Sequence, residues 1–199
     1  MLAAAGALLA GGYGEQLARS IGIRRPVLLV WTILALGLSA INLPLARGTI
    51  LVNVGGTVAP AAFAAFLTSQ VAGLSARLRV GLVALVCAVP LAAITAWGEL
   101  TAIGWPAAVA AGCAAAAIAA ALSRDARATL ASIAAALAFS AGLWALGAAR
   151  GWLAWPAALG GGASFDAGVV ALLSGQVAAW VAASGPGRKP VAGTDSSAP

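Results

Sequence analysis

Acidic and amide side chains are rare in this chain, and their positions relative to long apolar runs identify the residues that can do chemistry. Asp166 is the most unusual of them, because it leads directly into the apolar run at 167–183. A charge at the start of a membrane-length segment is costly unless a partner or water solvates it. A carboxylate there can bind a cation, a proton or an amine, and it can equally cap the first turn of a helix. Both roles stay open for Asp166.

Metal and cofactor chemistry finds few ligands in this sequence. Histidine is absent, which removes the commonest ligand for haem, copper and zinc and the easiest proton relay. Cys87 and Cys113 each lie in the middle of an apolar segment without the spacing of a metal site, so we expect small buried hydrophobes. We therefore expect no cofactor and no metal, which leaves carboxylates as the groups for acid–base catalysis.

The composition excludes an ordinary soluble domain. The 199 residues are 62% hydrophobic and 8% charged, with a mean hydropathy of +1.01, whereas soluble domains carry about 25% charged residues. The apolar segments are continuous rather than alternating, which favours helices over a membrane β-barrel. We predict an all-α protein, a polytopic bundle of about six transmembrane helices of which one or more are broken.

Six apolar segments have the length that a membrane crossing needs. They are approximately 26–45, 49–73, 80–97, 105–122, 128–148 and 165–183. The chain thus divides into an interfacial N-terminal segment at 1–25, a membrane domain at 26–184 and a disordered cytoplasmic tail at 185–199. Residues 1–12 are too short to cross the bilayer alone, and a truncated extra span is the alternative there.

The basic residues predict the orientation of the bundle. Six crossings put both termini and every second connection on one side, and that side holds nine of the eleven basic residues. The nine are Arg19, Arg24, Arg25, Arg77, Arg79, Arg124, Arg127, Arg188 and Lys189. By the positive-inside rule both termini are cytoplasmic, and we expect a bacterial plasma (inner) membrane. Because these charges are scattered singly or in pairs, we expect no nucleic-acid partner.

The same topology gathers the remaining polar residues near the outer face. They are Asn42 at the end of the first segment, Asn53 at the start of the second, Glu99 between the third and fourth, and Asp166 at the start of the sixth. Arg47 and Arg150, the two outer basic residues, lie at the same level and can pair with Asp166 or Glu99. A binding site and a purely structural ion pair are both consistent with this grouping.

Gly55 and Gly56, with Pro60, interrupt the second segment within its first third. Such breaks are tolerated at membrane depth where neighbouring groups or a cavity satisfy the freed carbonyls, and transporters place substrate at them. We predict a broken helix at these glycines. Close helix packing through small residues is the alternative, as on the face of the sixth segment formed by Gly168, Ala171, Gly175 and Ala178.

Asn42 has two interpretations of its own. It precedes Leu43-Pro44, and proline pushes the preceding residue out of helical geometry, so the motif is typical of a helix stop. Alternatively, Thr32, Ser39 and Asn42 fall on one face of a continuous helix, a stripe that would face protein or water.

Four motifs stand out in order along the chain. They are Ile41-Asn42-Leu43-Pro44, Val52-Asn53-Val54-Gly55-Gly56 with Pro60, Ile103-Gly104-Trp105-Pro106, and Gly160-Gly161-Gly162-Ala163-Ser164-Phe165-Asp166. Together they resemble a family of bacterial and archaeal multi-pass membrane proteins, the domain of unknown function sixteen-fourteen. The resemblance covers about 26–183 and implies a membrane fold with a shared site, but no activity.

This chain departs from the family pattern at two positions. The family's Gly-Ala-Asp motif is Gly147-Ala148-Ala149 here, and its Phe-Asp-Gly motif is Phe165-Asp166-Ala167. An intramembrane hydrolase that used two aspartates sharing a proton would therefore lack one of them in this chain. Glu99 would replace it only if the fold brought Glu99 close to Asp166.

Three functions follow as hypotheses. We first expect a small-solute or ion transporter, or a channel-like protein, with a polar site open to the outer face. That binding site would comprise Asn42, Asn53, Gly55, Gly56 and Asp166. The alternatives are an intramembrane enzyme that uses Asp166 and Glu99 on a lipid-linked or peptide substrate, and a scaffold subunit that binds another membrane protein or a second copy through small-residue faces.

Overall fold

The computed structural model describes residues 15, 18–19, 21–45, 50–100, 104–123, 125–152, 159–161 and 163–184. Much of the expected interfacial segment at 1–25 lies outside these ranges, as do the expected tail at 185–199 and Arg47. Of Glu99 only the backbone is described.

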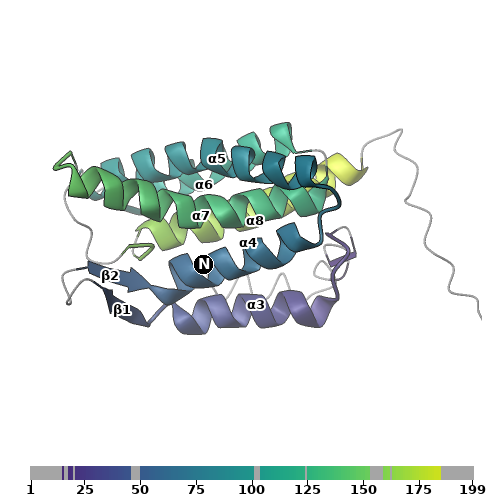
Figure 1. Ribbon diagram of the computed structural model, residues 1–199, viewed down its shortest axis with the longest axis horizontal. Helices are drawn as coiled ribbons and strands as arrows, with labels where there is room; N and C mark the ends of the chain where they lie inside the picture. Colours follow the sequence, from purple (N-terminus) through teal and green to yellow (C-terminus); the bar gives the residue numbers. More distant parts are fainter. Residues whose placement is uncertain are drawn as a thin grey trace, which may run out of the picture.

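The described chain forms a bundle of helices with a short hairpin at one end. In chain order the elements are α3 (Arg25–Leu38), β1 (Asn42–Leu45), β2 (Ile50–Asn53), the π-helical turn η2 (Val54–Val58), α4 (Ala59–Ser69), α5 (Leu74–Leu100), α6 (Gly104–Leu122), α7 (Ala126–Ala149) and α8 (Ala163–Ser184). Successive helices run in opposite directions along the long axis (Figure 1). One end, the hairpin end, holds β1, β2 and the start of α8. The other, the basic end, holds the starts of α5 and α7 with Arg77, Arg79 and Arg127.

α7 is the central helix of the bundle, because it packs against α4, α5, α6 and α8. It begins after Asp125, whose carboxylate accepts a hydrogen bond from the Ala128 amide at 2.7 Å. Such an N-cap contributes about 1 kcal/mol to helix stability. The segments predicted at 105–122, 128–148 and 165–183 correspond to α6, α7 and α8 to within two residues at each end.

Small side chains let the helices approach closely. The core between α5, α6, α7 and α8 is built mainly from alanine, including Ala84, Ala88, Ala111, Ala115, Ala119 and Ala136. At Gly112 of α6, an added Cβ would lie 2.6 Å from the carbonyl oxygen of Ala167 in α8. The backbones of α6 and α8 therefore touch where a larger residue would not fit.

The small-residue face predicted on the sixth segment packs against α7. A Cβ at Gly168 would lie 2.7 Å from the side chain of Leu137, and a Cβ at Gly175 would collide with Ile133. Ala171 lies between them in the same core and is fully buried. This prediction is confirmed for the three residues, and the side chain of Ala178 is outside the described set.

The first two predicted spans contain a β-hairpin, which corrects the expectation of helix alone. β1 pairs antiparallel with β2, so that Asn42 lies opposite Asn53. α3 ends at Leu38, which confirms the helix stop and contradicts the continuous polar stripe through Ser39 and Asn42. Pro44 lacks an N–H and disfavours helical geometry in Leu43, so a helix is disfavoured through the residues that form β1.

Three of the described helices are long and apolar enough to cross a membrane, namely Leu74–Ile94, Trp105–Leu122 and Ala126–Ala149. Shorter apolar helical stretches occur at Pro26–Ala35, Val54–Ser69 and Asp166–Gly175. The 14 residues of α3 reach about 21 Å, short of the hydrocarbon thickness of about 30 Å. The four residues of β1 add about 13 Å, so that helix and strand together have the reach of a crossing.

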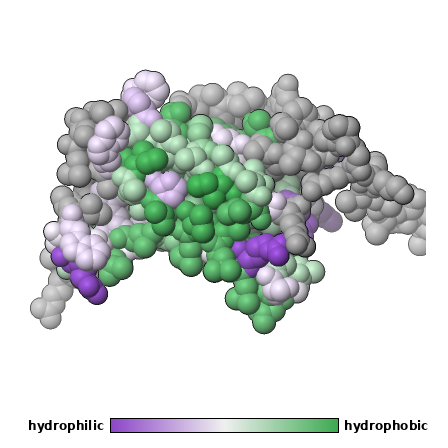
Figure 2. Space-filling model, turned by 90° about the horizontal axis from the view of Figure 1, so that it is seen from above, coloured by the Kyte–Doolittle hydropathy of each residue, from purple (hydrophilic) through white to green (hydrophobic). Residues whose placement is uncertain are grey.

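The outer surface of the bundle is apolar. α5 exposes Leu78, Leu82 and Val89, whose exposed fractions are 61%, 65% and 58%. Figure 2 shows apolar residues across the middle of one face, with the most hydrophilic residues near its two ends. An exposed apolar surface of this extent is rare on soluble monomers and is typical of a protein surrounded by lipid.

Candidate functional site

Asn53 is the buried polar residue of the hairpin end. It lies at the junction of β2 and η2 and is 4% exposed. Its Nδ2 donates hydrogen bonds to the carbonyl oxygen of Ser39 at 2.5 Å and to Oδ1 of Asn42 at 3.0 Å. Its Oδ1 accepts a hydrogen bond from the Gly56 amide at 2.7 Å. The Asn53 side chain therefore caps η2 and ties it to the chain that leaves α3.

Gly55 and Gly56 are buried in η2 because other backbone segments lie against them. A Cβ at Gly55 would collide with the backbone of Ala35 and Ser39, and a Cβ at Gly56 would collide with the carbonyl oxygen of Gly160. The predicted broken helix is wrong in detail, because the segment is a strand up to Asn53, and Gly55 and Gly56 lie in η2, which continues into α4 as one helical stretch, Val54–Ser69. Close packing, given above as the alternative, occurs at the same two residues.

A segment from the far end of the sequence completes this structure. Leu159 forms a parallel bridge with Val52, and its amide donates to the Leu51 carbonyl oxygen at 2.8 Å. The carbonyl oxygen of Leu159 accepts from the Asn53 amide at 2.9 Å and from Oγ1 of Thr57 at 3.1 Å. Leu159 is therefore held by β2 and by Thr57 of η2.

Four of the five residues expected to bind a ligand are thus brought together. We call Asn42, Asn53, Gly55, Gly56 and Gly160 the amide–glycine cluster. Gly160 adopts φ = +75°, a left-handed conformation that glycine adopts without strain. Asn42 is the exposed member, and its own Nδ2 makes no hydrogen bond to a described residue. Most of the polar groups in the cluster are used to hold it together.

Asp166, the fifth expected residue, lies at the same end on α8, which contacts η2. It is the fourth residue of the helix rather than its N-cap, and its side chain is exposed. A carboxylate in the first turn is favoured by the helix dipole. Within the described chain Asp166 makes no hydrogen bond or ion pair, so it is not joined to Asn42 or Asn53.

The predicted ion pairs at this end have one described basic member, Arg150. Its guanidinium lies 6.0 Å from the ring centroid of Trp152, and no ion pair joins it to Asp166 in the described structure. Arg47 and the side chain of Glu99 lie outside the described residues, so their pairing remains a prediction. Among the residues described, no cluster of three or more acidic, Cys or His side chains forms a metal site.

Sequence reasoning missed two parts of the molecule. The role of Leu159 depends on its backbone, and the run Gly160-Gly161-Gly162 signalled an unusual conformation without identifying its partner. A cavity at the basic end, lined by Arg79 and Asp125, also went unnoticed, because Arg79 had been used only to predict the orientation and Asp125 had not been singled out.

No protein-family model matches this chain, and no curated protein or solved structure shows significant similarity to it.

Proposed function

We propose that this protein is a multi-pass protein of a bacterial inner membrane, and that its hairpin end is the outer opening of a pathway for a small cation or a protonated amine. The supporting observation is that strands replace helix at the end of the first apolar segment, in β1, and at the start of the second, in β2. Non-helical backbone at membrane depth is tolerated where it is buried in protein or lines a water-filled cavity, and broken helices are where transporters bind substrate.

The residues of the hairpin end divide into two roles in this proposal. Three residues maintain the structure of this end, namely Asn53, Gly55 and Gly56. Asn53 forms hydrogen bonds to the protein's own chain, and the two glycines are covered by its backbone. Asp166 and Asn42 supply the groups that meet the solute, because both are exposed and each retains unused hydrogen-bonding capacity toward the described residues. An exposed carboxylate at this end favours a cation over an anion.

The distribution of basic residues supports the orientation. Arg77, Arg79 and Arg127 lie at the basic end, whereas Arg150 is the described basic residue at the hairpin end. Under the positive-inside rule the basic end faces the cytoplasm and the hairpin end faces outward.

Flux measurements on purified protein in liposomes test the proposal. We expect the protein to conduct protons, monovalent cations or small amines, and Asp166→Asn to reduce that flux at least about tenfold, because removal of a binding charge commonly costs that much. Asp195→Asn, which removes the same charge from the C-terminal sequence, is the matched control and should leave flux unchanged. Equal flux in the two variants, or none above protein-free liposomes, would contradict the proposal and favour the scaffold or the enzyme.

A further inference from the structure

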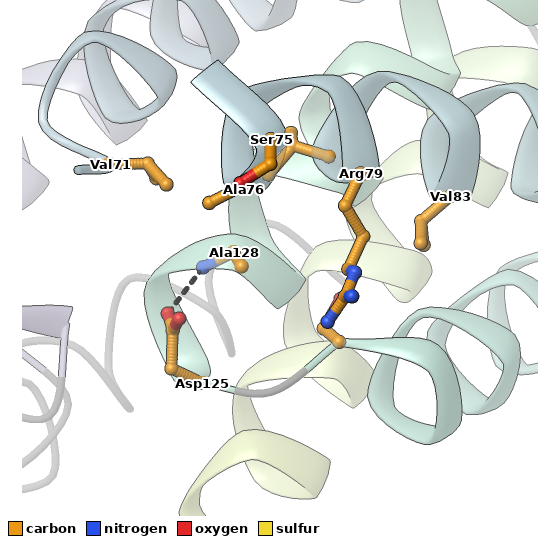
Figure 3. A pocket seen from close by; sticks show the side chains of 9 residues that line it. Val71, Ser75, Ala76, Arg79, Val83, Asp125 and Ala128 are labelled. Atoms are coloured by element: carbon orange, nitrogen blue, oxygen red, sulfur yellow. Dashed lines mark hydrogen bonds between the residues drawn. The ribbon is translucent and has the colours of Figure 1, made fainter. Parts of the chain in front are cut away.

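A second polar site lies at the basic end. A cavity of about 160 Å³ opens between the start of α5 and the connection from α6 to α7. It is lined by Val71, Ser75, Ala76, Arg79, Val80, Val83, Ser123, Asp125 and Ala128 (Figure 3). Its volume is well above the roughly 30 Å³ that one water molecule occupies in the liquid. The cavity therefore has room for a small polar group.

Two opposite charges line the cavity without neutralising each other. Figure 3 shows Arg79 and Asp125 on either side of the space. Within the described structure no ion pair joins them, and the Arg79 guanidinium has no hydrogen-bond partner there. The Asp125 carboxylate uses Oδ1 to accept from the Ala128 amide at 2.7 Å. A positively charged hydrogen-bond donor, the Arg79 guanidinium, and a carboxylate, that of Asp125, thus line the same small cavity.

The other arginines of the basic end that the structure describes near this cavity are occupied. Arg77 donates to the carbonyl oxygens of Val71 at 2.9 Å and Ser69 at 3.0 Å. Arg127 donates to the carbonyl oxygens of Ile21, Gln70 and Gly22. These two guanidiniums fasten chain segments to each other. Arg79, in contrast, is directed at the cavity with its donors unused by the described chain.

A buried hydroxyl supplies an independent indication of a ligand. Oγ of Ser123 lies out of contact with solvent and has no hydrogen-bond partner among the described residues, although Ser123 lines the cavity. Buried polar atoms without partners are rare in folded proteins, because leaving one unpaired costs free energy. An oxygen atom of a bound group would satisfy it once the cavity wall opened toward Oγ, and the exposed Ser75 offers a second hydroxyl on the same wall.

We propose that this cavity binds a phosphate ester that carries a protonated amine, as in the phosphoethanolamine group. Arg79 with the hydroxyls of Ser75 and Ser123 would hold the phosphate, because guanidinium and hydroxyl groups are strong phosphate donors. Asp125 would accept the ammonium group. The apolar side chains of Val71, Val80 and Val83 would border the remainder of the molecule.

The source of this group is a phospholipid headgroup or a free phosphoethanolamine. The location at one end of an apolar bundle fits a lipid of the inner leaflet, and this placement rests on the orientation proposed above. The chemistry of the cavity does not depend on it. A negative result in the Asp166-dependent flux measurement would therefore not contradict this binding site. A negative result in the binding measurement would not contradict the proposed flux.

Binding to delipidated protein in detergent tests the proposal, with phosphatidylethanolamine and phosphatidylglycerol as probes. We expect a preference for phosphatidylethanolamine. Arg79→Gln should weaken binding of both lipids about tenfold, as expected for loss of a charge-assisted hydrogen bond to phosphate. Asp125→Asn should remove the preference while keeping the helix cap, since Asn caps as well as Asp. Arg24→Gln, which removes one exposed positive charge, is the control and should change neither affinity.

Three results would overturn the site. They are an equal effect of Arg79→Gln and Arg24→Gln, a lipid preference unchanged by Asp125→Asn, and an absence of binding by either probe. If Arg79→Gln does not fold, Ser123→Ala decides, with about threefold weaker binding supporting the site and unchanged binding refuting it. Soluble phosphoethanolamine identifies the source, because its competition shows that the headgroup suffices, and its failure to displace bound lipid shows that the lipid is the ligand.

Discussion

The two ends of this bundle use scarce polar groups in opposite ways. At the hairpin end, Asn53 makes three hydrogen bonds to its own chain, and Gly55 and Gly56 are covered by other backbone. At the basic end, Arg79 and the hydroxyl of Ser123 line a cavity without partners in the described structure. A polar residue in an apolar chain is therefore a structural group where its hydrogen bonds are complete and a candidate binding group where they are not.

Within each end the same contrast separates neighbouring residues. Asn42 and Asn53 face each other across two strands, but only Asn53 is buried and fully used. Arg127 and Arg79 are both basic-end guanidiniums, but only Arg127 bonds to three carbonyl oxygens. The two members of each pair have the same residue type but different hydrogen bonding. If the difference is real, substituting the bonded member should lower stability more than substituting the other.

The largest effect is expected at Gly56. Gly56→Ala would place a methyl group against the carbonyl oxygen of Gly160, and rigid backbone on both sides cannot yield without breaking the amide–glycine cluster. We expect a loss of more than about 3 kcal/mol in the free energy of unfolding. Unfolding in mixed micelles with increasing sodium dodecyl sulfate measures it.

Gly142→Ala in α7 is the matched control for this substitution. A Cβ at Gly142 meets nothing within 4 Å, so alanine there should leave stability unchanged or raise it by about 0.5 kcal/mol through its better helix propensity. If the two alanine variants unfold alike, the close backbone contact between η2 and Gly160 does not exist.

The next largest effect is expected at Asn53. Asn53→Ala removes three hydrogen bonds and leaves the Gly56 amide and the Ser39 carbonyl oxygen without that partner, which should cost about 3 kcal/mol. Asn42→Ala removes one hydrogen bond at an exposed residue and should cost less than about 1 kcal/mol. Equal losses would show that Asn53 contributes no more to the stability of the fold than Asn42 does.

The sequence was sufficient to predict much of this architecture. α6, α7 and α8 are continuous apolar helices, so hydropathy and end signals located them closely. α5 begins at Leu74, earlier than the predicted 80, because Arg77 and Arg79 belong to the helix although their charges mark the end of an apolar window. Hydropathy thus locates the most apolar part of a helix and misses its polar extension.

The hairpin end was predicted less well, for a different physical reason. Asn42 and Pro44 correctly indicated the end of the first helix, but Gly55, Gly56 and Pro60 lie in one helical stretch that starts at Val54. The strand state of Ile50–Asn53 depends on pairing with β1 and with Leu159, which lies far along the chain. Long-range backbone pairing leaves no local pattern, so Asn53 was expected to serve a ligand when its hydrogen bonds in fact serve the fold.

At the basic end, a smaller effect should separate two arginines. Arg127→Gln would release the carbonyl oxygens of Ile21, Gln70 and Gly22 and should destabilise the protein by about 2 kcal/mol. Arg79→Gln removes the same charge without a described hydrogen bond and should change stability by less than about 0.5 kcal/mol. Unfolding midpoints in mixed micelles test this, and a loss in Arg79→Gln as large as in Arg127→Gln would show that Arg79 also fastens the fold.

The smallest effect compares two serines and is the most direct test of the unpaired hydroxyl. Oγ of Ser132 donates to the Val80 carbonyl oxygen at 3.3 Å and is fully buried, so Ser132→Ala should cost about 1 kcal/mol. Oγ of Ser123 has no such bond, so in delipidated protein Ser123→Ala should be neutral or stabilising by a few tenths of a kcal/mol. With phosphatidylethanolamine added, the wild-type protein should become more stable than Ser123→Ala, because the lipid would stabilise the wild type more than the variant. An identical gain in both would mean that the Ser123 hydroxyl does not meet the lipid.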